Sequence, residues 1–296
     1  MAGVKLVVPD GSMEKVVTDL LTRAHIQAGP RHPRTGYAPS TVSFIDVIRY
    51  RRPQIIPRLI KRGRYDVGIA GQDWMAESGV ISGMFFKIPR GKSSTRPPRI
   101  VLAVKQDSPY QTITDLPRDC TIVSEYPKIA SAYCRRQGRE DIKIEPSPGQ
   151  SEAIEEFDAE AAIELTDSGE SLIVHNLREI DELMTSSTVL IANHEAFADK
   201  TMRGYIDCLV NLIAGAWKAQ QLIYLIANVP RAILTEAAYL MGGLKAPTVS
   251  PTTRGDIVSV AAYVPLDKHI DVILALTNIG VTDIGTFESG IVTSTN

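Results

Sequence analysis

Cysteine is scarce in this sequence and follows no metal-binding or disulfide pattern. The three cysteines, Cys120, Cys134 and Cys208, are odd in number and widely spaced, and none belongs to a CxxC motif. A disulfide framework or a cysteine-based zinc site is therefore not expected, and a reducing cytoplasm fits better. The five histidines form no HxH or HxxxH pair, so they indicate no metal site either.

Long apolar runs and an excess of positive charge are also lacking. A membrane helix needs about 18 consecutive apolar residues, and no run in the chain approaches that length. The first residues show no signal-peptide pattern. With 32 basic and 34 acidic residues, the formal charge is -2, without the net basic surface that favours duplex DNA. We expect a cytoplasmic protein that binds neither membranes nor nucleic acid. The chain has no GxSxG nucleophile elbow and no GxxxxGK[ST] phosphate loop.

What is present is an alternation of apolar runs and amphipathic helical patterns over 296 residues, a length that predicts two or three domains. The runs that predict buried strands lie at residues 4–8, 66–71, 100–104, 121–124, 161–165 and 188–193. The helical patterns lie at residues 13–24, 51–62, 128–138, 169–183 and 200–219. Such alternation predicts parallel α/β sheets covered on both faces. Polar, Pro-rich stretches at 90–99 and 145–150 indicate that two lobes precede residue 220.

The pattern changes after residue 220. Strands are predicted at residues 222–229, 248–250, 257–264 and 283–287, and helices at 230–241 and 266–279. This β-α-β-β-α-β order predicts a ferredoxin-like split βαβ unit. A unit of this kind with one free sheet face is often a ligand-sensing or assembly module, although a fold alone does not give a function.

The segment with most chemical information is 160–172, EAAIELTDSGESL. A predicted strand containing Glu164 runs into the loop 166–169, and a predicted helix follows. Hydroxyls and backbone N–H groups at a helix N-terminus favour a phosphate, and Gly169 lets the backbone approach it. Glu164 is placed to accept hydrogen bonds from ribose hydroxyls. The alternative is a capping box with Asp167 as the cap and Glu170 closing it, and these two carboxylates would repel a phosphate unless they point away or act through a metal.

Two further turns follow predicted strands, where ligands collect in open α/β sheets. The first is Asp10, Gly11 and Ser12, and the second is Gly71, Gln72 and Asp73. Ordinary helix starts are the alternative, with Ser12 or Asp73 as the N-cap. Arginines and lysines gather at 49–64 and 90–99, a pattern that suits polyanionic small molecules. A solvated helix face is the alternative for most of residues 58–64.

Taken in order, these segments resemble the long form of the ATP phosphoribosyltransferase family. The stretches that carry the resemblance span nearly the whole chain: VVPDGSM, RRPQIIP, YDVGIAGQDWMAESG, PRIVLAV, SEYPKIASAYC, GQSEA, AAIELTDSGESL, STVLIAN and GLKAPTVSP. GIAGQDW, the loop in AAIELTDSGESL, and LKAPTVSP are the most specific of them.

The resemblance implies two α/β lobes of the type II periplasmic-binding-protein kind and a C-terminal ACT-like regulatory domain. We expect lobe I at residues 1–100 plus about 184–220, lobe II at 101–183, and the ACT-like domain at 221–296. The implied reaction is phosphoribosyl transfer from phosphoribosyl pyrophosphate to N1 of ATP, releasing pyrophosphate, the first step of histidine biosynthesis. The family resemblance also implies Mg2+, feedback inhibition by histidine, and assembly into dimers or hexamers.

Carried over to this chain, the phosphate-binding positions are Thr166, Asp167, Ser168, Gly169, Glu170 and Ser171, with Glu164 near the ribose. The positions implied for the cleft and polyphosphates are Asp10, Gly11, Ser12, Arg52, Gly71, Gln72, Asp73 and Arg99. Thr248 and Ser250 are the candidate effector residues, with simple strand-edge hydroxyls as the alternative.

The chain departs from the family pattern at the first turn. Asp10 and Ser12 stand where the family usually has a Lys and an Arg, and Ile55 stands where an acid is usual. Ala70 replaces a usual Thr, and Glu164 a usual Asp. Two alternatives to the implied activity therefore stay open. One is a paralogue that transfers phosphoribosyl to another acceptor, and the other is a non-catalytic nucleotide-sensing subunit.

Overall fold

The computed structural model describes residues 3–80, 84–88, 97–147, 152–244 and 246–293. Residues 90–96 of the predicted basic loop, and the start of GQSEA, lie outside these ranges. The chain divides into two compact units, one of residues Met1–Val17 and Ala28–Asp207 and the other of Thr18–Gln27 and Cys208–Asn296. The three domain boundaries expected from the sequence stay a prediction.

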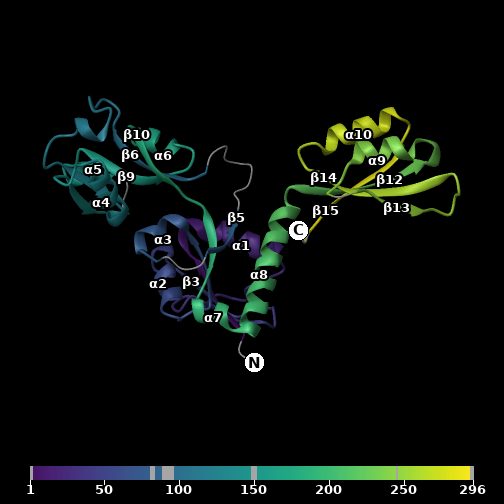
Figure 1. Ribbon diagram of the computed structural model, residues 1–296, viewed down its shortest axis with the longest axis horizontal. Helices are drawn as coiled ribbons and strands as arrows, with labels where there is room; N and C mark the ends of the chain where they lie inside the picture. Colours follow the sequence, from purple (N-terminus) through teal and green to yellow (C-terminus); the bar gives the residue numbers. More distant parts are fainter. Residues whose placement is uncertain (1–2, 81–83, 89–96, 148–151, 245, 294–296) are drawn as a thin grey trace. The chain divides into compact units, whose positions relative to one another are not determined.

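The first unit contains a six-stranded sheet in the order β2-β3-β1-β4-β11-β5 (Figure 1). Its strands are β1 Val4–Pro9, β2 Tyr37–Ala38, β3 Ile45–Arg51, β4 Val67–Gly71, β5 Met84–Ile88 and β11 Thr188–Ala192. The helical segments of this unit are η1 Gly11–Met13, η2 Pro53–Ile55, α2 Ile56–Lys61, α3 Gln72–Ser78 and α7 His194–Ala198. The helix α1 Glu14–Arg23 begins in this unit and continues into the second. Ile56 and Ile60 of α2 are fully buried against Val7 and Ala70, so α2 covers the middle of one sheet face.

A second, five-stranded sheet of the same unit has the order β10-β6-β9-β7-β8. Its strands are β6 Arg99–Lys105, β7 Thr121–Ser124, β8 Lys143–Pro146, β9 Ala161–Thr166 and β10 Leu177–Thr185. Its helical segments are η3 Ile113–Asp115, α4 Pro127–Arg136, α5 Glu152–Glu156 and α6 Glu170–Val174. Apolar clusters lie on both faces, so this sheet is buried as expected.

Both sheets are mixed, and the expectation of purely parallel sheets was wrong. In the first sheet β11 runs antiparallel to β4 and β5, and in the second β6 runs antiparallel to β9 and β10. The reason is the chain path, because β10 and β11 carry the chain back from the second sheet into the first. Insertion of this returning strand beside β4 is the arrangement of type II periplasmic-binding-protein folds, in agreement with the expected fold class.

The helix predicted at 169–183 was also wrong. The helix α6 ends at Val174, and β10 follows as a strand paired with β6. The register of β10 shifts between Glu179 and Asp181 and again between Glu182 and Met184. Such β-bulges interrupt the two-residue alternation. Leu177, Ile180 and Leu183 therefore recur every three residues and imitate a helical stripe.

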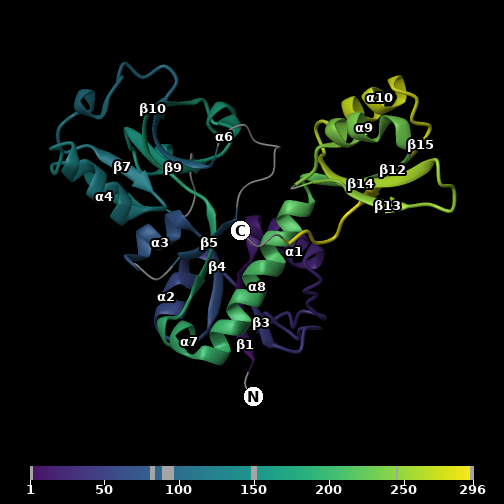
Figure 2. The same ribbon diagram turned by 45° about the vertical axis from the view of Figure 1, so that its right-hand side comes forward.

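The second unit contains an antiparallel sheet of four strands in the order β13-β14-β12-β15. Its elements are β12 Leu222–Pro230, η4 Arg231–Ile233, α9 Leu234–Met241, β13 Thr248–Pro251, β14 Ile257–Pro265, α10 His269–Asn278 and β15 Asp283–Glu288. Both helices lie on one face of this sheet (Figures 1 and 2). Alternate residues of β12 and β14, such as Leu225 and Val260, are buried with them. The predicted βαββαβ unit is therefore confirmed.

The long helix α8 Lys200–Ala219 leads into this domain. The end of the chain returns to it, because Val292 N–H donates to the Gly215 carbonyl at 3.0 Å. A Cβ on Gly215 would lie 2.6 Å from Cγ2 of Ile291. Glycine is therefore required where the C-terminal segment crosses the helix.

Candidate substrate site

The loop after β9 has the strand–loop–helix form that the sequence predicted. Gly169 is the residue before α6 and has φ +85°, a left-handed conformation that side chains other than glycine rarely adopt. The N-cap residue of α6 is Gly169, not Asp167, and glycine has no side chain with which to cap the helix. The Ser168 hydroxyl accepts a hydrogen bond from the Glu170 N–H at 3.3 Å, at the first residue of α6.

Two polar side chains of β9 are buried beside this loop and lack a partner. Glu164 and Thr166 are each 2% exposed. Oε2 of Glu164 and Oγ1 of Thr166 have no hydrogen-bond partner among the residues that the structure describes. Residues two apart on a strand point to the same face. Because buried polar atoms are nearly always hydrogen-bonded, this pair is suited to a polar ligand.

Burial changes the acidity of Glu164. Loss of hydration raises the pKa of its carboxyl from 4.5 to about 7. A carboxyl with a pKa near neutrality is common at functional sites, where it accepts or releases a proton. Ribose hydroxyls that donate to this carboxylate would lower its pKa again, because they favour the charged form.

The opening turn brings together an acid and two arginines. Oδ2 of Asp10 lies 3.6 Å from Nη2 of Arg31, and Oδ1 lies 3.8 Å from Nε of Arg52. Arg31 also donates to Glu14 at 2.7 Å, and its guanidinium lies over the Tyr50 ring. Arg31 was not predicted from the sequence. It lies far along the chain from the turn, and no motif connects the two.

The same turn places Arg52 over Gly11. A Cβ on Gly11 would lie 3.6 Å from Nη1 of Arg52, whose side chain is 75% exposed. This cation is therefore available to a ligand. Ser12 lies inside η1 and is not an N-cap, because the cap residue of η1 is Asp10 and α1 begins only at Glu14.

Asp73 is buried in a hydrogen-bond network and neither caps α3 nor faces open space. Its carboxylate accepts from the Tyr126 hydroxyl at 2.9 Å and from the Ser186 hydroxyl at 2.6 Å. A Cβ on Gly71 would clash with Oδ1 of the buried Asp73, which favours glycine before α3. Gln72 lies between them, and its N–H donates to the Ser187 carbonyl at 2.9 Å. These contacts position the Asp73 carboxylate, and its predicted role in lining the cleft stays a prediction.

This network reaches β9, the strand that leads into the loop. The Tyr126 N–H donates to the Ser124 hydroxyl at 2.9 Å, and that hydroxyl donates to the Ile163 carbonyl at 2.8 Å. Ile163 precedes Glu164, so a continuous hydrogen-bonded path runs from α3 to β9. Burial and the nearby Asp73 carboxylate raise the pKa of Tyr126, which keeps its hydroxyl protonated and donating.

A second contact joins the two sheets through their helices. Glu77 of α3 accepts from the N–H groups of Lys128 and Ile129, at 3.0 Å each to Oε2. These are the first turn of α4, where no residue of its own caps the helix. Gln54 adds a hydrogen bond to Glu125 at 3.3 Å. One lobe thus caps a helix of the other.

Arg99 is paired with acidic side chains, and its predicted place near the polyphosphates stays a prediction. Its guanidinium donates to Glu179 and Glu182, and its side chain is only 12% exposed. The bond to Glu179 is the main reason that the pKa of Arg99 is raised. With two acids compensating its charge, Arg99 connects β6 to β10.

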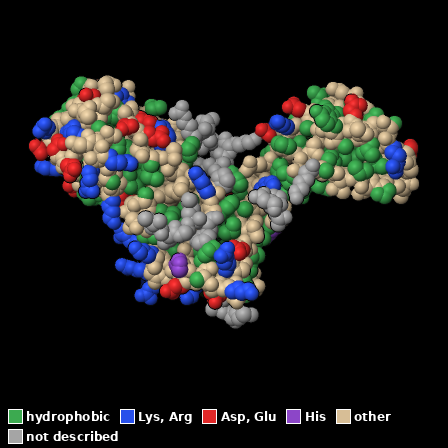
Figure 3. Space-filling view, in the orientation of Figure 1, with side chains coloured by type: hydrophobic (Ala, Val, Ile, Leu, Met, Phe, Trp, Pro, Cys, Tyr) green, Lys and Arg blue, Asp and Glu red, His purple; other side chains and the backbone are tan. Residues whose placement is uncertain are grey.

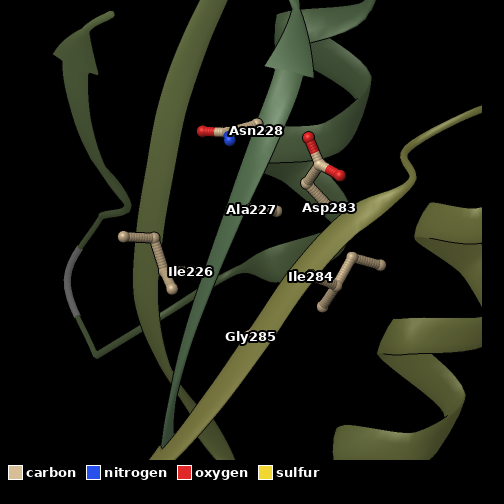
Figure 4. A pocket seen from close by; sticks show the side chains of 6 residues that line it. All are labelled: Ile226, Ala227, Asn228, Asp283, Ile284 and Gly285. Carbon is tan, nitrogen blue, oxygen red and sulfur yellow. The ribbon is translucent and has the colours of Figure 1, made fainter.

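Thr248 and Ser250 lie on the edge strand β13 of the second unit, on the sheet face opposite the helices. Ser250 pairs with Ser259, which pairs with Asn228, which in turn pairs with Asp283. These four side chains form a polar row across the sheet. A hollow of about 330 Å³ lies beside Asn228 and Asp283 (Figure 4). Neither Asn228 nor Asp283 was predicted from the sequence. Asn228 could have been, because it stands between the buried residues Ala227 and Val229 and therefore points to the open face.

Among the described residues, no three His, Cys, Asp or Glu side chains gather in a way that could hold a metal ion. No helix in the described ranges is long and apolar enough to cross a membrane. The fold and the loop define a two-lobed α/β small-molecule-binding protein with a C-terminal βαββαβ domain.

Comparisons with known proteins identify the family within this class. The family profile described as ATP phosphoribosyltransferase matches residues 52–215, and the profile of the HisG C-terminal domain matches residues 219–288. An ATP phosphoribosyltransferase of Koribacter versatilis is 35% identical over 257 residues, covering 86% of this chain and 87% of that protein. One from Nitratidesulfovibrio vulgaris strain Miyazaki F is 34% identical over 277 residues, or 93% of each chain. This chain therefore belongs to the ATP phosphoribosyltransferase family, and it is an enzyme of the glycosyltransferase class that acts in histidine biosynthesis.

A solved structure supports the fold. The ATP phosphoribosyltransferase HisG:HisZ complex of Thermotoga maritima matches with a TM-score of 0.59 and 22% identity, covering 71% of this chain and 96% of that one. At that identity the likeness shows the fold alone.

Proposed function

We propose that this protein transfers the phosphoribosyl group of phosphoribosyl pyrophosphate to N1 of ATP, releases pyrophosphate, and is inhibited by histidine. The observation that carries the proposal is the buried pair Glu164 and Thr166, whose free oxygens adjoin the loop of Ser168 and Gly169. In this proposal the loop binds the 5-phosphate through hydroxyls and backbone N–H groups. Glu164 accepts hydrogen bonds from the ribose hydroxyls.

The reaction depends mainly on positioning the two substrates and on stabilising the charge that develops between them. As pyrophosphate leaves C1 of the ribose, the sugar gains oxocarbenium character, and N1 of adenine attacks that carbon. Carboxylate oxygens near the ribose stabilise the positive charge, and Arg52 offers an exposed cation to phosphates. The network of Asp73, Tyr126 and Ser124 holds β9 in register with the other lobe, so that the reacting atoms are oriented.

Mg2+ fits this proposal as an ion carried by the substrate phosphates. Magnesium usually takes only one or two protein carboxylates and keeps its other ligands from phosphates and water. The unpartnered Oε2 of Glu164 is one such donor at the loop, and no larger acidic cluster is found among the described residues. Bound there, the ion would neutralise the pyrophosphate as it leaves.

Histidine suits the polar row of the C-terminal domain. The carboxylate of Asp283 would bind its ammonium group, and Asn228 with the hydroxyls of Ser250 and Ser259 would bind its carboxylate and ring. Thr248 lies one row further along the same face. We also propose that the open face joins copies of the chain into dimers or hexamers, and that the enzyme acts in the cytoplasm.

A turnover assay distinguishes this function from its alternatives. The full-length protein is assayed with phosphoribosyl pyrophosphate, Mg2+ and ATP, and then with other nitrogen bases in place of ATP. We expect pyrophosphate release with ATP only. Release with another acceptor would favour the paralogue, and no release with binding intact would favour the sensing subunit.

The altered first turn gives a second test of the acceptor. If Asp10 and Ser12 replace two phosphate-binding cations, then Asp10→Lys with Ser12→Arg should tighten ATP binding measured by calorimetry. Asp10 already draws Arg31 and Arg52 toward the turn, so the same double variant also releases both arginines. Unchanged or weaker ATP binding would mean that the turn serves another acceptor.

A further inference from the structure

A second hollow of the first unit contains none of the candidate substrate residues. It has a volume of about 590 Å³. The residues that line it are Lys5, Tyr37, Val47, Arg49, Arg51, Ile55, Leu59, Arg64 and Tyr65. They come from β1, β2, β3, from α2 itself and from the segments on either side of it, and we call this hollow the basic groove. Lys and Arg side chains also gather on the surface of this lobe over α2 (Figure 3).

The sequence of β3 explains why charges gather here. Val47, Arg49 and Arg51 alternate with the buried residues Ile48 and Tyr50, so the first three point to one face of the sheet. On that face α2 covers β1 and β4 but leaves the outer strands β3 and β2 open. The cations therefore form the floor of a groove whose apolar wall includes Ile55 and, from α2, Leu59.

The cations of the basic groove are not paired with carboxylates among the residues that the structure describes. Four of its lining residues are cations and none is acidic. Among the ion pairs of the described residues, none includes Lys5, Arg49, Arg51 or Arg64. The Nη1 atoms of Arg49 and Arg51 both donate to the Thr35 carbonyl, at 3.0 and 2.7 Å. Two like charges held on one oxygen repel each other, and an anion would relieve that repulsion.

The remaining lining residues indicate what kind of anion fits. Tyr37 already stacks with a guanidinium, because the Arg49 carbon Cζ lies 5.2 Å from the centre of its ring. Tyr65 offers a second ring, and Val47, Ile55 and Leu59 offer apolar surface. Arginines bind phosphates bidentately, and tyrosine rings stack on nucleobases. The volume lies in the range of small-molecule sites.

We propose that the basic groove binds a nucleoside polyphosphate, with the phosphates on Arg49, Arg51, Lys5 and Arg64 and the base against the tyrosines and α2. This site is separate from the phosphate loop, so it is independent of the proposed transfer reaction. A nucleotide bound here lies on the strand that leads to Arg52 and the opening turn.

Calorimetric titration of the full-length protein with ATP at low ionic strength tests the proposal. We expect two ATP molecules per chain in the wild type and one in Arg49→Gln with Arg51→Gln, or at least tenfold weaker binding at the second site. The double variant Lys5→Gln with Arg64→Gln should show the same loss of ATP binding. It leaves the hydrogen bonds of Arg49 and Arg51 to Thr35 in place. The matched control is Arg58→Gln with Arg62→Gln, which removes two exposed cations around α2 that do not line the groove.

The ligand class is tested by replacing ATP with inorganic tripolyphosphate or with adenosine. We expect both to bind the groove at least tenfold more weakly than ATP. Tripolyphosphate binding as tight as ATP would overturn the assignment to a nucleotide. Unchanged ATP stoichiometry and affinity in Arg49→Gln with Arg51→Gln, or equal loss in the control variant, would overturn the site itself. A single ATP per wild-type chain that this double variant loses would instead place the only ATP in the groove and count against ATP as the acceptor in the cleft. Thermal melting of each variant separates lost binding from lost folding.

Discussion

At the scale of single residues, the phosphate loop depends on backbone shape more than on side-chain bulk. Gly169 has a positive φ, yet a Cβ there would meet nothing within 4 Å in the described structure. A side chain at this position would therefore cost backbone strain and would occupy the open space that we assign to the phosphate. Both effects act on ligand binding, and only the first acts on folding.

We predict that Gly169→Val weakens binding of phosphoribosyl pyrophosphate by about tenfold or more, equivalent to about 1.4 kcal/mol. The measurement is calorimetric titration in the presence of Mg2+. Gly138→Val is the matched control, because Gly138 also has a positive φ and free space but lies after α4, in the sequence far from the loop. Equal binding by the Gly169 variant and the wild type would show that the loop is not the phosphate site.

The buried carboxyl of Glu164 should make stability depend on pH. Its pKa is about 7 in the folded protein against 4.5 when exposed, so the folded state holds the proton more tightly. Protein stability is therefore highest below pH 4.5 with respect to this group, and that advantage is lost as the pH rises through 7. The difference corresponds to about 3 kcal/mol.

Glu164→Gln should remove this dependence. We expect the variant to gain stability over the wild type as the pH rises from about 5 to 8, by up to about 3 kcal/mol in the free energy of unfolding in urea. The control is Glu145→Gln. Glu145 is an exposed carboxylate on a strand, so its replacement relieves no desolvation. If the variant's gain in the free energy of unfolding were the same at pH 5 and at pH 8, ionisation of Glu164 would not be its cause.

At the scale of helices and strands, α3 stabilises the start of α4. Glu77 supplies the acceptor that α4 lacks, and it comes from 51 residues earlier in the chain. Its carboxylate also meets the positive end of the helix dipole. The contact therefore serves both the helix and the connection between the two sheets.

Glu77→Ala should lower the free energy of unfolding by about 1 kcal/mol, as loss of a helix cap does. Urea unfolding followed by circular dichroism measures this change. Glu156→Ala removes an exposed helical carboxylate of α5 and should have little effect. If both variants lose the same stability, the capping contact contributes nothing specific.

At the scale of the whole molecule, the open face of the C-terminal sheet is the surface that we expect to join copies of the chain. Beside the polar row this face carries Tyr224 paired with Tyr263 and with Phe287, which is 59% exposed. The two tyrosine rings lie 5.1 Å apart. Exposed aromatic groups on an uncovered sheet favour association.

Light scattering of the full-length protein should give a mass of at least two 32.3 kDa chains. We expect Phe287→Asp to reduce the mass, because a charge would be buried in the interface. Tyr239→Asp is the control, since Tyr239 is 85% exposed but belongs to α9 on the other side of the sheet. A wild-type mass of one chain, or equal dissociation of both variants, would assign this face another role.

The sequence by itself determined most elements and the loop. Apolar runs located β1, β4, β6, β7, β9 and β11, and helical periodicity located α1, α4 and α8, because burial is encoded locally in these segments. The C-terminal βαββαβ order followed from the same patterns. The strand–loop–helix around Gly169 was also predictable, since glycine and hydroxyl residues at a strand end are a local feature.

Only the tertiary structure decided which side chains meet. The bulges of β10 disguised a strand as a helix, and the returning β11 made both sheets mixed. The pairing of Arg99 with Glu179, of Asp73 with Tyr126, and of Asp10 with Arg31 joins residues that no motif connects. A sequence pattern records the burial and turns of its own segment. The partners of a charge depend on how distant segments pack, and packing here pairs Asp73 with Tyr126 and Arg99 with Glu179 and brings Arg31 beside the opening turn.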